Sequence, residues 1–401
     1  MLTRRSFLQS SAAVAALSAT AGSARAETPG ITDTEIKIGQ TMPYSGPASA
    51  YGVIGKADAA YFKMINEQGG VNGRKITLIS LDDGYSPPKT VEQTRRLVEQ
   101  EQVAFLFNPL GTACCASVRQ YLNDNKVPQL FVATGASIFA DPEHFPWTIG
   151  WQPSYGTEAI IFGKYIVQQK PDAKIAILFQ NDGFGKEYLS GLKTGLGAEH
   201  ANMVIKEVSY ETSEPTVDSQ VVTLQGSGAD VFVIAATPKF AAQAIRKSYD
   251  IGWSATRIMT DVSQSISAVM KPAGVDKSKG VITAIYGKDP TDARWKDDPG
   301  YKQYADFIAK YMSPNDLIDY FAVYGFGTSA TMVQVLKQCG SDLSRENIMR
   351  QAANLKNFVL PMGLPGMSIN TSPTNFSPIR QEQLASFNGE SWEPFGDLMM
   401  G

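Results

Sequence analysis

The sequence predicts an α/β protein of two lobes, each built on a doubly wound parallel sheet. Strand-like and helix-like segments alternate through the first 150 residues, and the alternation then starts again and continues to about residue 286. Such alternation is typical of parallel sheets covered by helices. The chain has 401 residues, and even without a predicted leader of 26 residues it is too long for one ordinary core.

The first 26 residues predict an export signal of the twin-arginine type. Arg4 and Arg5 precede an Ala-rich run that extends to Ala21, and Ala24-Arg25-Ala26 is a small-x-small pattern that a signal peptidase cleaves. An N-terminal anchor is the alternative, but the run is too short and too polar for a hydrocarbon core of about 30 Å. We therefore expect cleavage after Ala26 and a periplasmic location.

The first round of elements begins with a predicted strand at 35–39, where polar and apolar residues alternate. Gly69-Gly70 ends the helix that follows, and Asn72-Gly73 is a tight-turn signal before the next strand. The remaining elements predicted in this round are a strand at 75–81, a helix at about 88–101, a buried strand at 103–107, a helix from about residue 112, a strand at 129–132 and a segment around 147–150.

The second round predicts helices at 157–168, 184–195, 217–224 and 238–251, and strands at 174–179, 203–210, 231–235 and 257–261. A strand at 281–286 and helices at about 301–311, 320–338 and 345–355 remain. They are too few for a third domain, so we expect them to complete the first two. The predicted lobes are therefore 30–149 with 287–356, and 150–286 with 357–401.

Composition and motifs disfavour several classes of function. The formal net charge is −3, and it becomes −6 without the leader, which carries three arginines and no acid. Such an acidic chain is a poor candidate for binding nucleic acid. No G-x-S-x-G, phosphate-loop, H-E-x-x-H or C-x-x-C pattern is present, and neither His144 nor His200 has a partner pattern, so we expect no enzyme and no cofactor.

The three cysteines do not predict a metal site. The number of cysteines is odd, and their spacing is not that of metal ligands: they are Cys114, Cys115 and Cys339. Cys114 and Cys115 could form a strained vicinal disulfide, but two small buried residues at a helix start are favoured.

Four small, polar corners follow predicted strands and precede helices. Ligands of parallel sheets bind beyond the carboxyl ends of the strands, where helix N-termini point unpaired N–H groups. Glycine permits close approach and hydroxyl groups donate hydrogen bonds, which suits a carboxylate. One corner alone is better explained as a turn or helix cap, but four in register favour a cleft. The corners are Tyr44-Ser45-Gly46, Leu110-Gly111-Thr112, Ala133-Thr134-Gly135-Ala136-Ser137 and Asn181-Asp182-Gly183-Phe184-Gly185.

Several motifs resemble the leucine/isoleucine/valine-binding family of periplasmic proteins. They are Ser45-Gly46-Pro47-Ala48 with Tyr51-Gly52, the long segment 65–76 (INEQGGVNGRKI), Asp82-Asp83, Phe184-Gly185, Gly228-Ala229-Asp230-Val231 and Ala244-Ile245-Arg246-Lys247. The resemblance implies the type I periplasmic binding protein fold, with three crossovers at a hinge and closure of the lobes on a ligand. It also implies a monomer without cofactor that presents a small molecule to an inner-membrane ABC permease.

The resemblance also assigns candidate ligand contacts. In the first lobe, Thr112, with Gly111 at the same corner, and then Gly135 and Ser137, fall on positions that hold a ligand carboxylate, and Tyr51 falls on a tyrosine that lines the ligand's other side. In the second lobe, Phe184, Thr237 and Asp261 stand where relatives have two tyrosines and an acid that pairs with an ammonium group.

Because Phe184 and Thr237 lack the phenol hydroxyls that relatives have at these positions, the ligand class stays open. An unpaired buried ammonium is costly, so a small aromatic or aliphatic carboxylate is expected beside a branched-chain amino acid, and Asp261 could instead cap a turn. A ligand-sensing periplasmic subunit of a membrane receptor is the alternative to a transport role. A periplasmic hydrolase or dehydrogenase would lack its catalytic residues.

Overall fold

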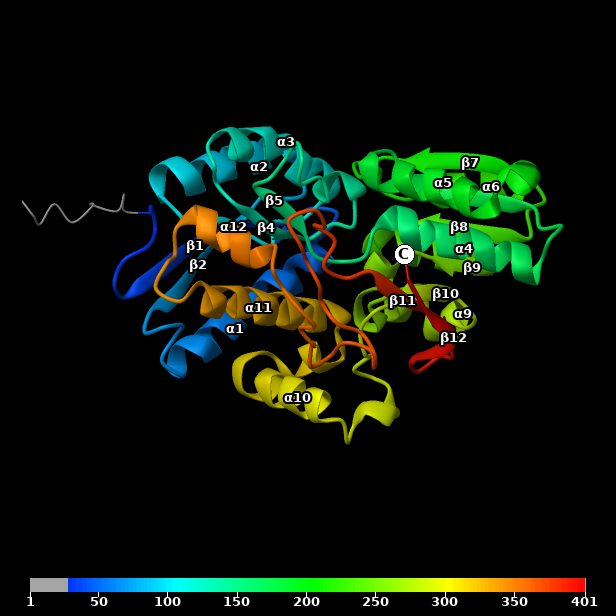
Figure 1. The fold of residues 1–401 in the computed structure, drawn as a ribbon. Coiled ribbons are helices and arrows are strands. Elements are labelled where there is room, and N and C mark those ends of the chain that lie inside the picture. The colour runs from blue at the N-terminus through cyan, green and yellow to red at the C-terminus, as the bar shows by residue number, and fades with distance from the viewer. Residues whose placement is uncertain (1–27, 401) are drawn as a thin grey trace, which may run out of the picture.

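The computed structural model describes residues 28–400, so the predicted leader and its cleavage site lie outside the described residues. Two separate sheets form the centres of two halves that lie side by side (Figure 1). The strand order is β2-β1-β3-β4-β5 in the first sheet and β12-β11-β10-β9-β8-β6-β7 in the second. The predicted class, two α/β lobes, is confirmed.

The first sheet is parallel throughout. Its strands are β1 (Glu35–Met42), β2 (Lys75–Asp82), β3 (Leu106–Phe107), β4 (Gln129–Val132) and β5 (Thr148–Gly150). The helices between them are α1 (Gly52–Glu67), α2 (Pro87–Arg95) and α3 (Thr112–Asp124). Strand β3 is shorter than the predicted 103–107, although the Phe105 carbonyl still accepts a hydrogen bond from the Gly39 N–H (3.0 Å).

Three later helices follow the second half in the chain: α10 (Pro299–Tyr311), α11 (Tyr320–Cys339) and α12 (Arg345–Ala352). Helix α11 is buried along nearly its whole length and lies against α1 (Figure 1). A Cβ atom on Gly325 would lie 2.7 Å from the Cβ of Ala57, so glycine permits this close approach. Helices α10, α11 and α12 therefore return to pack on the first lobe.

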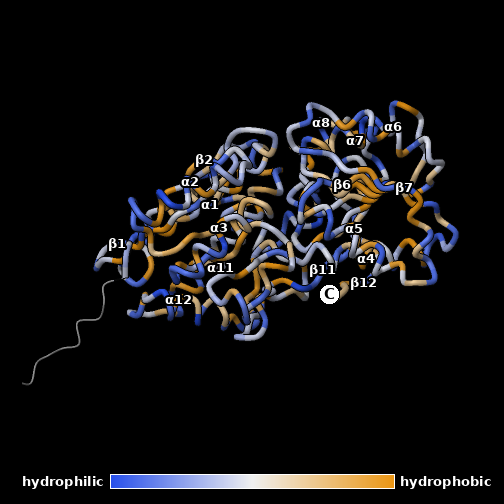
Figure 2. The backbone as a smooth tube through the Cα atoms, turned by 90° about the horizontal axis from the view of Figure 1, so that it is seen from above, coloured by the Kyte–Doolittle hydropathy of each residue, from blue (hydrophilic) through white to orange (hydrophobic). Residues whose placement is uncertain are grey.

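The second sheet is mixed. Strands β6 (Ile175–Gln180), β7 (Val204–Tyr210), β8 (Val231–Ala235), β9 (Thr256–Met259) and β10 (Ile282–Ile285) are parallel. The helices of this lobe are α4 (Tyr155–Gln169), α5 (Gly183–Leu196), α6 (Asp218–Gln225), α7 (Pro238–Asp250), α8 (Lys271–Ala273) and α9 (Val275–Ser278). The apolar colouring around β6 in Figure 2 marks the core of this lobe.

A C-terminal hairpin was not predicted from the sequence. Strand β11 (Gln381–Phe387) pairs antiparallel with β10 and with β12 (Trp392–Met400). The wholly parallel sheet expected for this lobe is therefore corrected to a mixed one. Glu382 and Leu384 are buried while Gln381 and Gln383 are only partly so, which is the pattern of a strand with one face on the core, and the alternation breaks at Ala385, which is also buried.

The chain passes between the two sheets three times: after β5, after β10, and before β11. The middle and last passages run together, since Gly287 and Gly363 form an isolated antiparallel bridge. The division into 30–149 with 287–356 and 150–286 with 357–401 stays a prediction. Across residues 28–400, no helix combines the length and apolar character needed to cross a bilayer.

Candidate functional site

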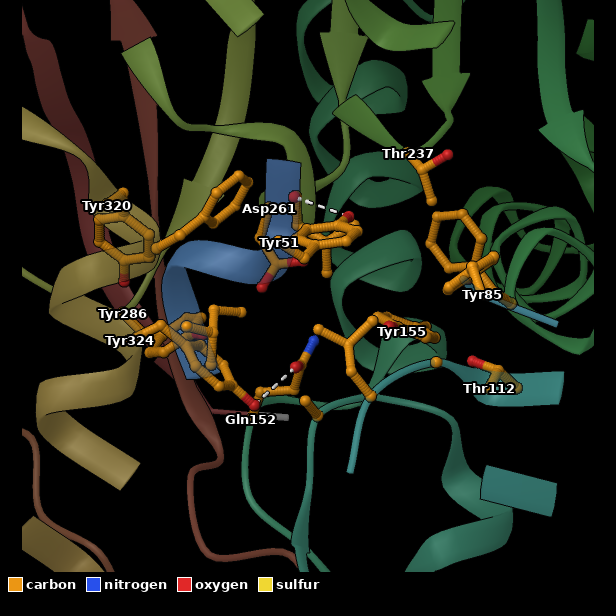
Figure 3. Close-up of a pocket in the computed structure, with 17 residues that line it drawn as sticks. Tyr51, Tyr85, Thr112, Gln152, Tyr155, Thr237, Asp261, Tyr286, Tyr320 and Tyr324 are labelled. Carbon is orange, nitrogen blue, oxygen red and sulfur yellow. Dashed lines mark hydrogen bonds between the residues drawn. The ribbon is translucent and has the colours of Figure 1, made fainter. Parts of the chain in front are cut away.

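A pocket lies between the two lobes and encloses about 510 Å³ of space not filled by protein atoms, its opening included. Its wall comes from the ends of strands and helices of both sheets and from the hinge (Figure 3). Eight of the 17 residues that line it are aromatic: Tyr51, Tyr85, Tyr155, Phe184, Tyr286, Tyr320, Phe321 and Tyr324. None of the residues that line the pocket is a lysine or an arginine.

The first-lobe end of the pocket is formed by the start of α3. Gly111 precedes the helix with φ of 102°, and a Cβ atom there would lie 2.7 Å from the Tyr85 ring. The Thr112 hydroxyl lies 2.6 Å from that of Thr134, and both residues are buried. The first N–H groups of a helix lack partners within it and carry partial positive charge. This end of the pocket therefore favours an oxygen or an anion.

Hydrogen bonds join the two lobes across the cleft, and two of them lie beside the pocket. The Tyr51 hydroxyl donates to the carbonyl of Val262 (3.0 Å), and the Gln180 side-chain amide donates to the Tyr85 hydroxyl (3.3 Å). Tyr51 also packs against Phe321, with ring centroids 4.9 Å apart. The two lobes therefore already touch across the pocket.

Gln152 lies where the chain first passes between the lobes. Its side-chain oxygen accepts a hydrogen bond from the Tyr324 hydroxyl (3.1 Å), and its side-chain nitrogen is buried without a partner. That nitrogen points into the pocket (Figure 3). An unsatisfied buried donor costs about 1–3 kcal/mol, so Gln152 favours a ligand with an acceptor at this point.

The second-lobe wall begins with Phe184 and Thr237. Phe184 packs edge-on against Tyr155, with ring centroids 5.0 Å apart. The Thr237 hydroxyl donates to the side-chain oxygen of Gln180 (3.2 Å), and the Thr237 N–H donates to the Tyr210 hydroxyl (3.0 Å). Because its polar groups have protein partners, Thr237 shapes this wall.

Asp261 contributes the acid of the pocket, two residues after β9. It is 3% exposed, and its N–H donates to the Glu158 carboxylate (2.8 Å). Tyr188 donates to the same carboxylate and lies 3.4 Å from the Asp261 carboxylate. Burial raises the pKa of Asp261 to about 6, and it raises the pKa of Glu158 well above its usual range, with the Asp261 charge adding to the rise.

The structure brings together most of the predicted site residues. Those that line the pocket are Tyr51, Gly111, Thr112, Phe184, Thr237 and Asp261. Gly135 and Ser137 do not line it: the Gly135 carbonyl accepts from the Tyr155 N–H, and Ser137 is exposed with its N–H donating to Glu187 (3.1 Å). Ligand contacts of these two residues stay predictions.

Sequence reasoning missed Gln152, Tyr85, Tyr155 and the tyrosines of the hinge. Tyr320 and Tyr324 are four residues apart on α11 and so share a helix face, but the sequence alone does not distinguish such a pair from core residues. Gln152 follows the last strand of the first lobe and precedes a proline, which marks only a turn. Their common position became visible only through the fold.

Comparison with known proteins gives consistent matches. A family model described as "periplasmic binding protein" matches residues 35–385. The Leu/Ile/Val-binding protein homolog 1 of Brucella abortus is 27% identical over 352 residues, which cover 85% of this chain and 86% of that protein.

Two solved structures share the fold. One is a branched-chain amino acid ABC transporter protein of Thermus thermophilus with bound valine, with a TM-score of 0.83 and 15% identity over 92% of this chain and 98% of that one. The other is an ABC transporter solute-binding protein of R. palustris in complex with benzoate, with a TM-score of 0.77 and 19% identity over the same shares.

Proposed function

Because the chain belongs to the periplasmic binding protein family, we propose that it is the substrate-binding component of an ABC importer and captures an amino acid with an apolar or aromatic side chain. The family is one of binding proteins, and its members act outside the cytoplasm. Residues matched to the family span both sheets and the hinge between them.

The observation that carries the ligand class is the opposite character of the two ends of the pocket. The first-lobe end has the N-terminus of α3 with Thr112, and the second-lobe end has the buried carboxylate of Asp261. A zwitterion would place its carboxylate at the first end and its ammonium group at the second. The aromatic rings between them would contact an apolar side chain.

Gln152 supports the same orientation. Its free amide nitrogen is a donor for the ligand carboxylate, and it lies at the hinge, between the two ends of the pocket. A ligand held by both lobes and the hinge would stabilise the arrangement in which the lobes touch.

A small aromatic or aliphatic carboxylate is the second candidate. Phe184 and the other rings favour it, because they form a wall that can contact an apolar or aromatic body. None of the lining residues is a lysine or an arginine, so the wall does not require a second acidic group on the ligand. An acid of this kind would gain nothing from a charged Asp261.

Asp261→Asn distinguishes the two candidates. A thermal-shift screen of amino acids and aromatic or aliphatic acids first finds the ligand, since a ligand at 100 times its dissociation constant stabilises the protein by about 2.7 kcal/mol. By calorimetry, an ammonium-bearing ligand should then lose about 2 kcal/mol or more in the variant, roughly thirtyfold in affinity. A simple acid should bind the variant equally or more tightly.

Asp58→Asn is the matched control, because Asp58 is also fully buried but does not line the pocket. Failure of every amino acid and every acid in the screen to bind would refute the proposed ligand class.

We also propose export through the twin-arginine route, action as a monomer and docking to a membrane permease. The paired arginines support the first, and a pocket completed within one chain supports the second.

A further inference from the structure

Three buried carboxylates meet behind the second-lobe wall of the pocket. Glu158 comes from α4, Asp261 follows β9, and Glu382 comes from β11. One oxygen of each lies within 4.8 Å of an oxygen of both others, and the three residues are 1–3% exposed. We call these residues the carboxylate cluster.

The carboxylate cluster lacks a compensating positive charge. In the described part of the chain, none of the ion pairs involves Glu158, Asp261 or Glu382. Buried carboxylates are normally paired or bound to a metal, because removing their charge from water is very unfavourable.

Glu382 provides the second, independent observation. Both of its carboxylate oxygens are buried and have no hydrogen-bond partner, although the side chain points into the cluster. Glu158, in contrast, accepts hydrogen bonds from the Asp261 N–H and from Tyr188. A buried carboxylate that the protein itself leaves without any donor needs a positively charged partner or a proton.

We propose that the carboxylate cluster binds a divalent cation, and Ca²⁺ in preference to Mg²⁺. Carboxylate oxygens are the ligands of hard cations. Ca²⁺ binds oxygens at about 2.3–2.6 Å, so three oxygens that all lie within 4.8 Å of one another can share one ion. Mg²⁺ holds oxygens closer and retains several waters, which suits a buried site poorly.

The surroundings supply further oxygen atoms and an entry path. The hydroxyl of Tyr188 contacts both Glu158 and Thr260, so two neutral oxygens adjoin the cluster. Asp261 belongs both to the cluster and to the pocket wall, so an ion can enter from the cleft.

An ion here is compatible with the proposed ligand. A divalent cation neutralises two of three carboxylate charges and leaves one net negative charge beside the pocket. The inference does not depend on the ligand, because the three residues come together in the protein without it.

The test uses the whole exported protein, stripped with a chelator and titrated with Ca²⁺, Mg²⁺ and the luminescent ion Tb³⁺. Calorimetry should find one Ca²⁺ per chain, bound more tightly than Mg²⁺, and Tb³⁺ emission should appear on excitation of tyrosine, since Tyr188 adjoins the site. Glu382→Gln should weaken Ca²⁺ binding about a hundredfold or more, because second-shell changes alone cost about 10–100-fold.

Glu187→Gln is the matched control. Glu187 is a partly buried glutamate of α5 that accepts hydrogen bonds from Ser137 and Gly156, outside the cluster. It should keep full affinity for Ca²⁺. If Glu382→Gln fails to fold, Glu158→Gln takes its place, with the same expected loss.

Less than about a tenth of an equivalent of Ca²⁺ bound at about 1 mM, the weak end of known calcium sites, would overturn the proposal. So would equal affinity in Glu382→Gln and the unmodified protein. Ligand binding measured in chelator keeps the two proposals apart: if an amino acid binds there while the titration finds no bound Ca²⁺, the cation proposal is overturned and the proposed function is intact.

Discussion

Thr112→Val tests the first-lobe end of the pocket. Thr112 begins α3, lines the pocket and is 3% exposed. Its hydroxyl lies 2.6 Å from that of Thr134. A hydroxyl has one proton and two acceptor positions, so Thr134 can donate to Thr112 and leave the Thr112 proton for a ligand carboxylate. Valine keeps the shape of the side chain and removes this donor.

The expected loss follows from the charge of the acceptor. A hydrogen bond to a charged group contributes about 1.5–3 kcal/mol, which corresponds to roughly ten- to over a hundredfold in affinity. The empty protein should lose about 1 kcal/mol of stability, because Thr134 loses its neighbour. The Ala136 N–H still donates to the Thr134 hydroxyl (3.2 Å), which keeps the corner in place.

Calorimetry on the folded protein measures the loss of ligand affinity, and unfolding in urea measures the loss of stability of the empty protein. Thr94→Val is the matched control: Thr94 is 1% exposed, its hydroxyl has no partner, and it lies on α2 outside the pocket. The control should bind as the unmodified protein does. Affinity within about twofold in Thr112→Val would mean that the carboxylate does not bind at this corner.

Two further predictions concern stability and export. Burial raises the pKa of Asp58 to about 7 although four side chains donate to it, so the folded state holds a proton that the unfolded state releases. The free energy of unfolding should therefore fall as pH rises from about 4 to about 7, and Asp58→Asn should flatten this slope in urea titrations; an unchanged slope would contradict the assignment. Changing Arg4 and Arg5 to lysine should leave unprocessed precursor in the cytoplasm, seen as a larger band on a blot of cell fractions. Normal processing of that variant would exclude the twin-arginine route.

The alternating fold could be predicted because buried parallel strands and amphipathic helices have distinct periods. The C-terminal hairpin could not, since β11 begins Gln381-Glu382-Gln383 and reads as polar and exposed. Only the structure shows that Glu382 faces inward, at 1% exposure. A signal was present in Asn388-Gly389, which lies between the two strands and is typical of hairpins.

The candidate site could be predicted where a glycine and a hydroxyl residue directly follow a strand. Gly111-Thr112 follows a buried strand, so its place at the pocket could be expected from the sequence. Asp261 was placed by family resemblance. Glu158 and Glu382 could not be found in this way, because they are more than 200 residues apart and meet Asp261 only through packing of α4 and β11 on the same lobe.

The pairing of β10 with β11 fixes when this protein can finish folding. Ile282 pairs with Ser386, across about 100 residues that include α10, α11 and α12. Strand β11 is synthesised about 100 residues after β10, so the second sheet cannot close until that intervening chain has been made. Long-range pairing of this kind is slow, and until it forms the outer edge of β10 is an open strand edge that can pair with other chains. The step most exposed to aggregation is therefore the pairing of the β11–β12 hairpin with β10.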